Sequence, residues 1–208
     1  MVDGRARRVS IGRRGSPTST VIAVSDADGD ALDHDADRWL VDKVRAGDVD
    51  AYEVLVRRHR DRIYRIALRM LGNPHDAEDV AQDVVIQLWT ALAGFVGSST
   101  FTTWLYRIVV NRCLNHLQRR RHTRPVLDAD SPPAPGAEET VIAEQRAAAT
   151  LRAIAALPPD LRAVLVLYQM EGLSYREVGA ITNLTESTVR GRLHRARLHL
   201  LDELRGWA

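Results

Sequence analysis

The side chains best suited to contact another molecule lie between residues 173 and 201, where arginines recur along an expected helix. Residues 187–201 carry four arginines and no acidic residue. At 100° per residue, the apolar positions of this segment share one narrow sector, and short polar residues and arginines lie on the outer side. Short side chains allow close approach to a DNA groove, and arginines can contact guanine edges or phosphates. The pattern predicts a face that binds duplex DNA, formed by Thr185, Ser187, Thr188, Arg190, Gly191, His194 and Arg195.

A helix-turn-helix would present this face, and the residues before it have the required types. Ser174 and Glu177 have the spacing of a capping box, so a helix should begin directly after Ser174. Gly179 leaves room for another helix to cross closely, and Asn183 tolerates a left-handed turn. Thr185 is a good N-cap for the second helix. A solvated basic face on an ordinary helical hairpin is the alternative, but the turn residues together favour DNA binding.

Charge is distributed in blocks along the rest of the chain, although the formal net charge is only +2. Residues 72–90 contain four acidic residues and no lysine or arginine, whereas residues 101–124 contain six arginines and no acid. Residues 127–144 are acidic again. Such alternation suggests separate surfaces for separate partners, since a basic surface suits nucleic acid and an acidic one suits a basic protein.

Helical periodicity predicts an all-α fold with two small helical domains joined by a flexible, acidic, proline-rich linker. Residues 1–34 lack periodicity and are expected to form a disordered tail. Residues 35–122 should form an N-terminal helical bundle. Residues 123–139 are the expected linker, and residues 140–208 are the expected C-terminal helix-turn-helix domain.

Composition narrows the class of protein. Apolar residues make up 45% of the chain and aromatic residues only 5%, so the cores should consist of aliphatic side chains. The single cysteine, Cys113, excludes an internal disulfide and fits a reducing cytoplasm. Cys113 and His116 supply only two ligands for a zinc ion, so we expect no metal site. The longest apolar run near the N-terminus is too short for a signal peptide or a membrane span, which predicts a cytoplasmic protein.

Four stretches, taken in order, resemble the extracytoplasmic-function (ECF) sigma factors, the minimal two-domain branch of the bacterial sigma-70 family. They are DAEDVAQDVVIQLW, STFTTWLYRIVVNRCLNHLQRRR, LPPDLRAVLVLYQMEGLSYREVGAI and ESTVRGRLHRAR, within about residues 36–206. The resemblance implies an alternative sigma factor that binds core RNA polymerase and directs promoter-specific transcription initiation, as in stress responses. It implies no catalytic activity, cofactor or small-molecule substrate, an anti-sigma factor as a further partner, and no regulatory domain after Ala208.

The resemblance also gives a role to the acidic helix expected after Asn73-Pro74. In that family this helix docks on the clamp helices of the polymerase β′ subunit, and the β subunit is a further partner. Two other interpretations stay open: a solvated helix whose acids are favoured by the helix dipole, and a carboxylate pair for catalysis or metal binding, which lacks further ligands. The implied docking residues are Asp76, Glu78, Asp79, Gln82 and Asp83.

The loop at residues 94–100 and the helix after it match the segment that opens and reads the −10 promoter element. Small residues let a strand approach, hydroxyls can bond to an extruded base, and arginines can contact phosphates. Trp104 is either a stacking surface or a core residue, and the arginine run 119–121 could instead stabilise a helix C-terminus. The implied −10 residues are Gly97, Ser98, Ser99, Trp104, Arg107, Asn111, Arg112, Asn115 and Arg119. The DNA-binding face on residues 185–195 would read the −35 element.

Two other functional classes agree less well with these features than a sigma factor does. A helix-turn-helix regulator would bind duplex DNA independently and sense a ligand through its N-terminal domain. The acidic helix followed by the arginine-rich helix favours the sigma factor, because a regulator needs neither. An enzyme is disfavoured because the sequence shows no nucleophile–base pair, phosphate-binding glycine loop or metal triad.

Overall fold

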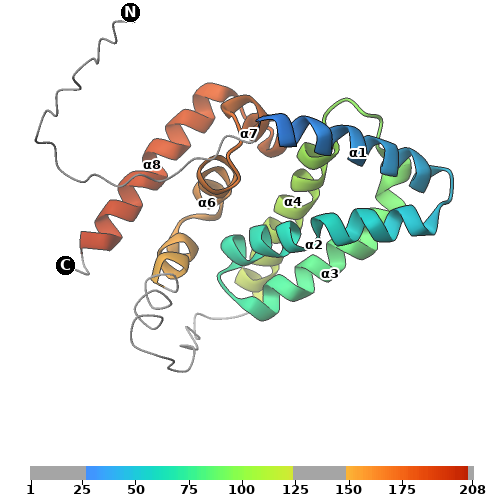
Figure 1. The fold of residues 1–208 in the computed structure, drawn as a ribbon. Coiled ribbons are helices and arrows are strands. Elements are labelled where there is room, and N and C mark those ends of the chain that lie inside the picture. Colours follow the sequence, from blue (N-terminus) through green and yellow to red (C-terminus); the bar gives the residue numbers. More distant parts are fainter. Residues whose placement is uncertain (1–26, 124–148, 206–208) are drawn as a thin grey trace, which may run out of the picture.

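The computed structural model describes residues 27–123 and 149–205, and every regular element in these two ranges is helical (Figure 1). This confirms the all-α prediction. Most of the expected tail and linker lies outside the described residues. The elements are α1 (Ala27–Arg45), α2 (Val49–Leu71), α3 (Pro74–Ala91), η1 (Leu92–Gly94), α4 (Phe101–Thr123), a helical segment at 149–156, α6 (Pro159–Leu165), the π-helical turn η2 (Val166–Met170), α7 (Tyr175–Thr182) and α8 (Glu186–Arg205).

The boundary between α2 and α3 follows local signals in the sequence. Gly72 ends α2 in the left-handed conformation, with φ 69°, and donates its backbone N–H to the Leu68 carbonyl. Asn73 caps α3 by accepting a hydrogen bond of 3.1 Å from the Asp76 backbone N–H, and Pro74 stands in the first turn. Local chemistry therefore sets the start of the acidic helix where the sequence predicted it.

Helix α1 begins at Ala27, inside the segment 1–34 that the sequence assigned to a disordered tail. Part of what holds this helix comes from α2, far away in the chain, which periodicity does not reveal. Asp37 anchors the helix: it is 1% exposed, one oxygen lies 2.9 Å from His59 Nε2, and the other accepts a hydrogen bond of 3.0 Å from Arg58. Burial by itself raises the pKa of Asp37, but His59 and Arg58 outweigh burial and hold the pKa below its ordinary value.

The helix-turn-helix forms as its turn residues predict. Ser174 and Glu177 complete a capping box at the start of α7, and Asn183 ends this helix in the left-handed conformation with φ 56°. Gly179 is required by the turn itself, because a Cβ there would lie 2.6 Å from the Leu184 carbonyl oxygen. The expected reason, a second helix crossing close by, is thus replaced by a close approach of the backbone that leads into α8.

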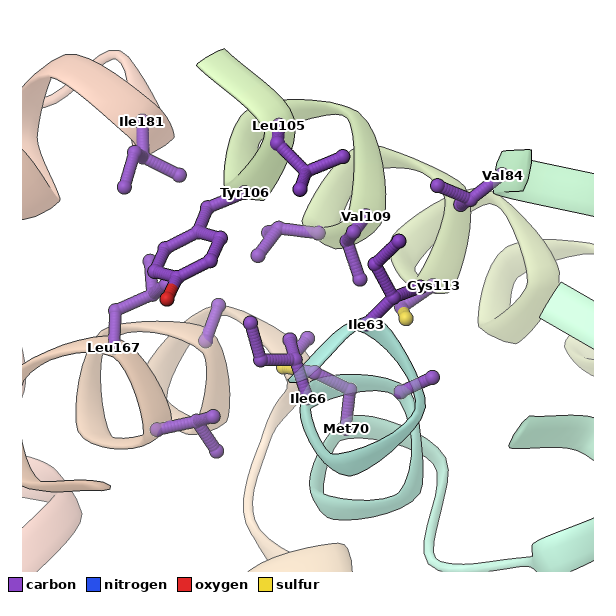
Figure 2. Packing of buried hydrophobic residues seen from close by; sticks show 14 of the residues in the cluster. Ile63, Ile66, Met70, Val84, Leu105, Tyr106, Val109, Cys113, Leu167 and Ile181 are labelled. Carbon is purple, nitrogen blue, oxygen red and sulfur yellow. The ribbon is translucent and has the colours of Figure 1, made fainter. Parts of the chain in front are cut away.

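The N-terminal half (27–123) and the C-terminal half (149–205) pack against each other, whereas the sequence indicated only two domains on a flexible linker. Helix α4 contacts α7, and both α6 and η2 contact α2. Figure 2 shows Tyr106 of α4 pointing toward the C-terminal half, in a cluster that includes Ile66, Leu167 and Ile181. The buried core is therefore continuous from one half to the other.

Two buried charged side chains also join the halves. Arg162 of α6 is 5% exposed and donates hydrogen bonds to the Met70 carbonyl near the end of α2 and to two carbonyls of its own half. Glu171, which follows η2, lies 2.6 Å from Arg69 Nη1 and 3.9 Å from Arg62 Nε, both on α2. Burial raises the pKa of Glu171, although these arginines oppose the shift. Polar contacts thus fix the orientation of the packed halves.

Candidate nucleic-acid and polymerase interfaces

The face of α8 predicted to read DNA is exposed at all seven of its residues. Thr185 acts as the N-cap, since its hydroxyl accepts a hydrogen bond of 3.3 Å from the Thr188 backbone N–H and lies 3.0 Å from the Ser187 hydroxyl oxygen. At Gly191 the place that a Cβ would take is open space, because no atom of the described residues lies within 4 Å of it apart from the local helix backbone and the two chain neighbours. The N-terminal part of α8 therefore presents short, polar side chains where a groove edge can come close.

The four arginines of α8 have different surroundings. Arg192 Nη1 lies 3.6 Å from a carboxylate oxygen of α6, and Arg197 donates a hydrogen bond of 3.4 Å to a glutamine of η2. Within residues 27–123 and 149–205, neither Arg190 nor Arg195 forms an ion pair. The guanidinium carbon of Arg190 lies 5.6 Å from the centre of the Tyr175 ring. Two arginines thus hold α8 on its own half, and two remain available to a partner.

The loop before α4, predicted to capture a base, borders a hollow of about 430 Å³. Gly97 and Ser99 line it, whereas the exposed Ser98 does not. Gly97 has φ 71°, a conformation that glycine adopts without strain. The opposite wall belongs to α1 and includes Asp42 and Arg45, which sequence reasoning missed because nothing local connects the two segments. A hollow of this size can admit a nucleobase between the loop and α1.

Trp104 belongs to a cluster of aromatic rings at the start of α4. Its ring centre lies 5.1 Å from that of Phe95 and 5.9 Å from that of Phe101. Phe101 also meets the buried His59 ring, at 5.2 Å between centres. Trp104 is half-buried: its ring packs on the core and keeps some surface exposed, and stacking on a base stays a prediction.

The remaining residues of the predicted −10 surface share one face of α4. The two asparagines and the last arginine of the set are exposed, and the other two arginines are half-buried. Arg112 donates a hydrogen bond of 2.9 Å to the Gln87 side chain of α3, beside a hollow of about 180 Å³ that both asparagines line. Amide and guanidinium groups therefore stand together on one side of the helix. The five residues are Arg107, Asn111, Arg112, Asn115 and Arg119.

The predicted docking residues of α3 divide between two surroundings. Four of the five are exposed. Asp76 is the exception, because its carboxylate pairs with Arg120 and lies 3.2 Å from His116 Nε2, both on α4. Glu78 and Gln82 line a groove of about 780 Å³ between α2 and α3. The surface open to a partner thus carries one fewer free carboxylate than the sequence implied. A groove lies beside this surface.

Two exposed apolar side chains accompany these acids, and sequence reasoning missed both. Ile86 is 67% exposed and Trp89 is 41% exposed, with the Trp89 ring packed edge-on against Tyr52 of α2 at 4.9 Å. At 100° per residue, Ile86 falls in the same sector as Asp79 and Gln82, so the sequence did contain the signal. Apolar and aromatic residues among charges are typical of protein-binding surfaces rather than of solvated ones.

The described residues offer no alternative chemistry at Cys113. The thiol is buried, and burial raises its pKa to about 12, which keeps it protonated and unreactive. Across 27–123 and 149–205, no three ligand-type side chains gather where they could hold a metal ion. The helices in these ranges also lack the combination of length and apolarity needed to cross a bilayer.

These features define a class of protein: an all-α chain with a helix-turn-helix in one half and, in the other, an acidic helix beside an arginine- and asparagine-bearing one. The family models agree, since Sigma-70 region 2 matches residues 55–123 and Sigma-70 region 4 matches residues 147–200. The chain belongs to the ECF sigma factors of the sigma-70 family.

Curated relatives extend this match over most of the chain. It is 40% identical to the ECF RNA polymerase sigma factor SigE of Mycolicibacterium smegmatis over 74% of its length, although the match spans only 62% of SigE. It is 34% identical to the RNA polymerase sigma-H factor of Pseudomonas aeruginosa, covering 80% of this chain and 92% of that one. The Escherichia coli ECF sigma-E factor is 36% identical, with 77% and 90% covered.

Solved structures are similar as well. CnrH, in complex with the cytosolic domain of CnrY, gives a TM-score of 0.64 at 28% identity, covering 83% of this chain and 99% of CnrH. RpoE of Bartonella quintana, in complex with the anti-sigma factor NepR, gives 0.59 at 22% identity, covering 74% and 96%, which shows a shared fold.

Membership in this family establishes the function in outline. The chain is a sigma factor that directs promoter-specific initiation of transcription, and sigma factors do so without catalysis. The region 2 match accounts for the acidic helix and the arginine-bearing helix together, and an independent regulator of duplex DNA would need neither.

Proposed function

We propose that the chain reads the −35 element through α8, captures the −10 element through the loop before α4 and one face of α4, and docks on core RNA polymerase through α3. The strongest support for this proposal is the α8 face, where all seven candidate residues are exposed and the start of the helix is capped. A helix presented in this way fits a major groove. The two functional units are then residues 27–123 and residues 149–205. The chain has no catalytic step of its own.

For polymerase docking, the proposed surface joins the exposed acids of α3 to an apolar centre. Exposed polar side chains lie on the two turns of α3 before Ile86, and the partner would cover Ile86; they are Glu78, Asp79, Gln82 and Asp83. Acidic side chains complement the basic clamp helices of β′ and speed the encounter, while apolar contact contributes affinity. Asp76 instead holds α4 against α3 through Arg120 and His116, so its role is to orient the −10 surface.

Use of both promoter elements requires the packed halves to separate. The elements lie about 25 base pairs apart, or roughly 85 Å of duplex DNA. A folded body of this size has a radius of gyration of only about 15 Å, so the packed form cannot span that distance. Residues 124–148 join the two described ranges and reach at most about 85 Å when fully extended. The junction of Arg162 and Glu171 must therefore open when both elements are bound.

A protein inhibitor and a cytoplasmic location complete the proposal. CnrH, at 28% identity, was solved in complex with the cytosolic domain of CnrY, and RpoE of Bartonella quintana with an anti-sigma factor. An anti-sigma factor for this chain would act by covering the α3 surface or by holding the packed halves together. The chain would then work in the cytoplasm, where core polymerase and promoter DNA are found.

The test is reversal of charge on α3. Replacing Asp79 and Asp83 by arginine should abolish co-purification with core polymerase, because it removes two negative charges and places two positive ones opposite the basic clamp helices, while helical content stays unchanged. The matched control reverses Asp50 and Glu53, two exposed acids near the start of α2, with the same change in net charge. Equal binding by the α3 variant and the control would refute the docking assignment.

A further inference from the structure

Tyr175, the first residue of α7, has two partners from different elements. Its ring is stacked on the Tyr168 ring of η2, with centres 4.7 Å apart and planes inclined by only 5°. The Arg190 guanidinium of α8 lies over the same ring, with its carbon 5.6 Å from the ring centre. Both tyrosines are half-buried. Three elements of the C-terminal half thus meet at one aromatic ring beside the DNA-binding face.

The backbone fixes where this ring stands. Tyr175 follows Ser174, the N-cap of a complete capping box, so its position in the first turn is set by hydrogen bonds rather than by the ring. Tyr168 lies in a π-helical turn, in which Glu171 N donates to the Val166 carbonyl at 3.1 Å. Single π-turns inside helices are uncommon and occur often at functional sites. Here the π-turn displays Tyr168 so that it supports Tyr175.

Among the residues that the structure describes, Arg190 has no other restraint of this kind. It is exposed, and in the described ranges it forms no ion pair, in contrast to Arg192 beside Asp160. A free arginine side chain samples many rotamers and loses that freedom when it contacts a base. A cation held over an aromatic face is attracted by the ring quadrupole, which restricts the side chain before DNA arrives. Restriction in the bound geometry raises affinity by removing part of the ordering cost.

We propose that Tyr175, supported by Tyr168, is a positioning residue that holds Arg190 for contact with base edges of the −35 element. This inference rests on the proposed reading of the −35 element by α8. It assigns the base preference at the positions that Arg190 touches to an aromatic pair outside the recognition helix. Loss of the ring should lower discrimination at those positions about two- to fivefold, the range expected for an exposed cation–π contact.

Two other roles for Tyr175 make different predictions. If the ring only packs against η2, its loss should weaken the fold and lower binding to all sequences alike. If its hydroxyl contacts DNA directly, Tyr175→Phe should behave like Tyr175→Leu. Under the positioning role, Tyr175→Phe keeps the ring and the wild-type preference, whereas Tyr175→Leu keeps apolar bulk and loses the preference.

The experiment uses the full chain assembled with core RNA polymerase and a promoter library in which the −35 segment is randomised. Bound sequences are recovered and counted for the wild type and for Arg190→Ala, Arg195→Ala, Tyr175→Leu and Tyr175→Phe. Tyr175→Leu should flatten the positions that Arg190→Ala flattens and spare those that only Arg195→Ala flattens. In the double variant of Arg190→Ala with Tyr175→Leu, the ring substitution should add no further loss.

Several outcomes would overturn the inference. A uniform loss in Tyr175→Leu, an unchanged profile, or additive losses in the double variant would each do so. A wild-type holoenzyme without any −35 preference would refute the proposed reading by α8, and the inference with it, whereas a wild-type preference that Tyr175→Leu leaves intact refutes the inference alone. Should Tyr175→Leu fail to fold in thermal unfolding, Tyr168→Leu decides, with a smaller change expected at the same positions and no change overturning the inference.

Discussion

Helix α8, proposed to read DNA, and the paired helices α3 and α4 all carry charged side chains but use them differently. On α8, Arg190 and Arg195 are exposed and form no ion pair within the described ranges. Between α3 and α4, opposite charges meet instead, as Asp76 pairs with Arg120 and lies beside His116. A block of charge in the sequence is therefore not equivalent to a charged surface, because some of the charged side chains pair with each other where the helices pack.

If the two halves act on separate DNA elements, cutting the chain between them should have the largest effect on transcription of all the changes proposed. When residues 1–122 and 140–208 are supplied as separate polypeptides, we expect promoter-directed transcription to be largely lost. Linkage gives the second half a local concentration in the millimolar range, which separate molecules at micromolar concentration lack. Transcription from a cognate promoter with core polymerase measures this, and full activity of the unlinked mixture would contradict it.

Arg162 tests whether the two halves unfold as one unit. Arg162→Met leaves three carbonyls near the junction without their donor, which should lower the free energy of unfolding by about 2–4 kcal/mol. Because one of these carbonyls belongs to α2, we expect chemical unfolding to separate into two transitions. The control is Arg57→Met, an exposed arginine paired with Glu53, for which the change should stay below about 0.5 kcal/mol. A single, unshifted transition in Arg162→Met would argue against a shared core.

The arginines of α8 can be sorted by comparing two substitutions. Arg195→Ala should weaken binding to the −35 element by about 1–3 kcal/mol if its guanidinium reaches a base edge. Arg192→Ala removes an ion pair with Asp160 and should change DNA affinity by less than about 0.5 kcal/mol. Holoenzyme binding to promoter fragments provides the measurement. Equal losses in both variants would mean that pairing within the fold does not predict which arginines contact DNA.

The last prediction concerns the pH dependence of stability that the buried anchor of α1 produces. The pKa of Asp37 is held below its ordinary value in the folded chain, so its contribution to stability is present above the unfolded pKa of about 4. That contribution is lost as the pH falls through the folded pKa. We expect the wild type to lose stability more steeply than Asp37→Asn as the pH falls below about 4, measured by thermal unfolding in a pH series. Parallel curves would show that Asp37 is not the titrating group.

Local signals in the sequence predicted many elements of the fold. The capping box of Ser174 and Glu177, the left-handed Asn183 and the Asn73-Pro74 start of α3 are all confirmed. These features depend on hydrogen bonds and backbone angles within a few residues, so the local residue types suffice. The start of α1 at Ala27 was missed, because part of what holds that helix is the distant pair Arg58 and His59.

The candidate surfaces were predicted with more uneven success. On α8 all seven residues are exposed, since a single helix sets its faces by period alone. On α3, the pairing of Asp76 depends on where α4 packs, so the sequence could not predict it. The exposure of Ile86 follows from the helical period of α3, so the sequence did contain that signal. The contribution of Asp42 and Arg45 to the loop hollow required the packing of α1.

By itself, the sequence determined the helices, their caps, the helix-turn-helix and the order of motifs that places the chain among the ECF sigma factors. Tertiary structure alone decided that the halves share a core, that Arg162 serves carbonyls of both, and that a side chain on Gly72, already disfavoured by its left-handed backbone, would also collide with the other half. A Cβ on Gly72 would stand 2.5 Å from the Ala155 Cβ, although the two residues are far apart in the chain. Such contacts follow from how whole helices pack, and helical period and capping, which act within one or two turns, carry no information about them.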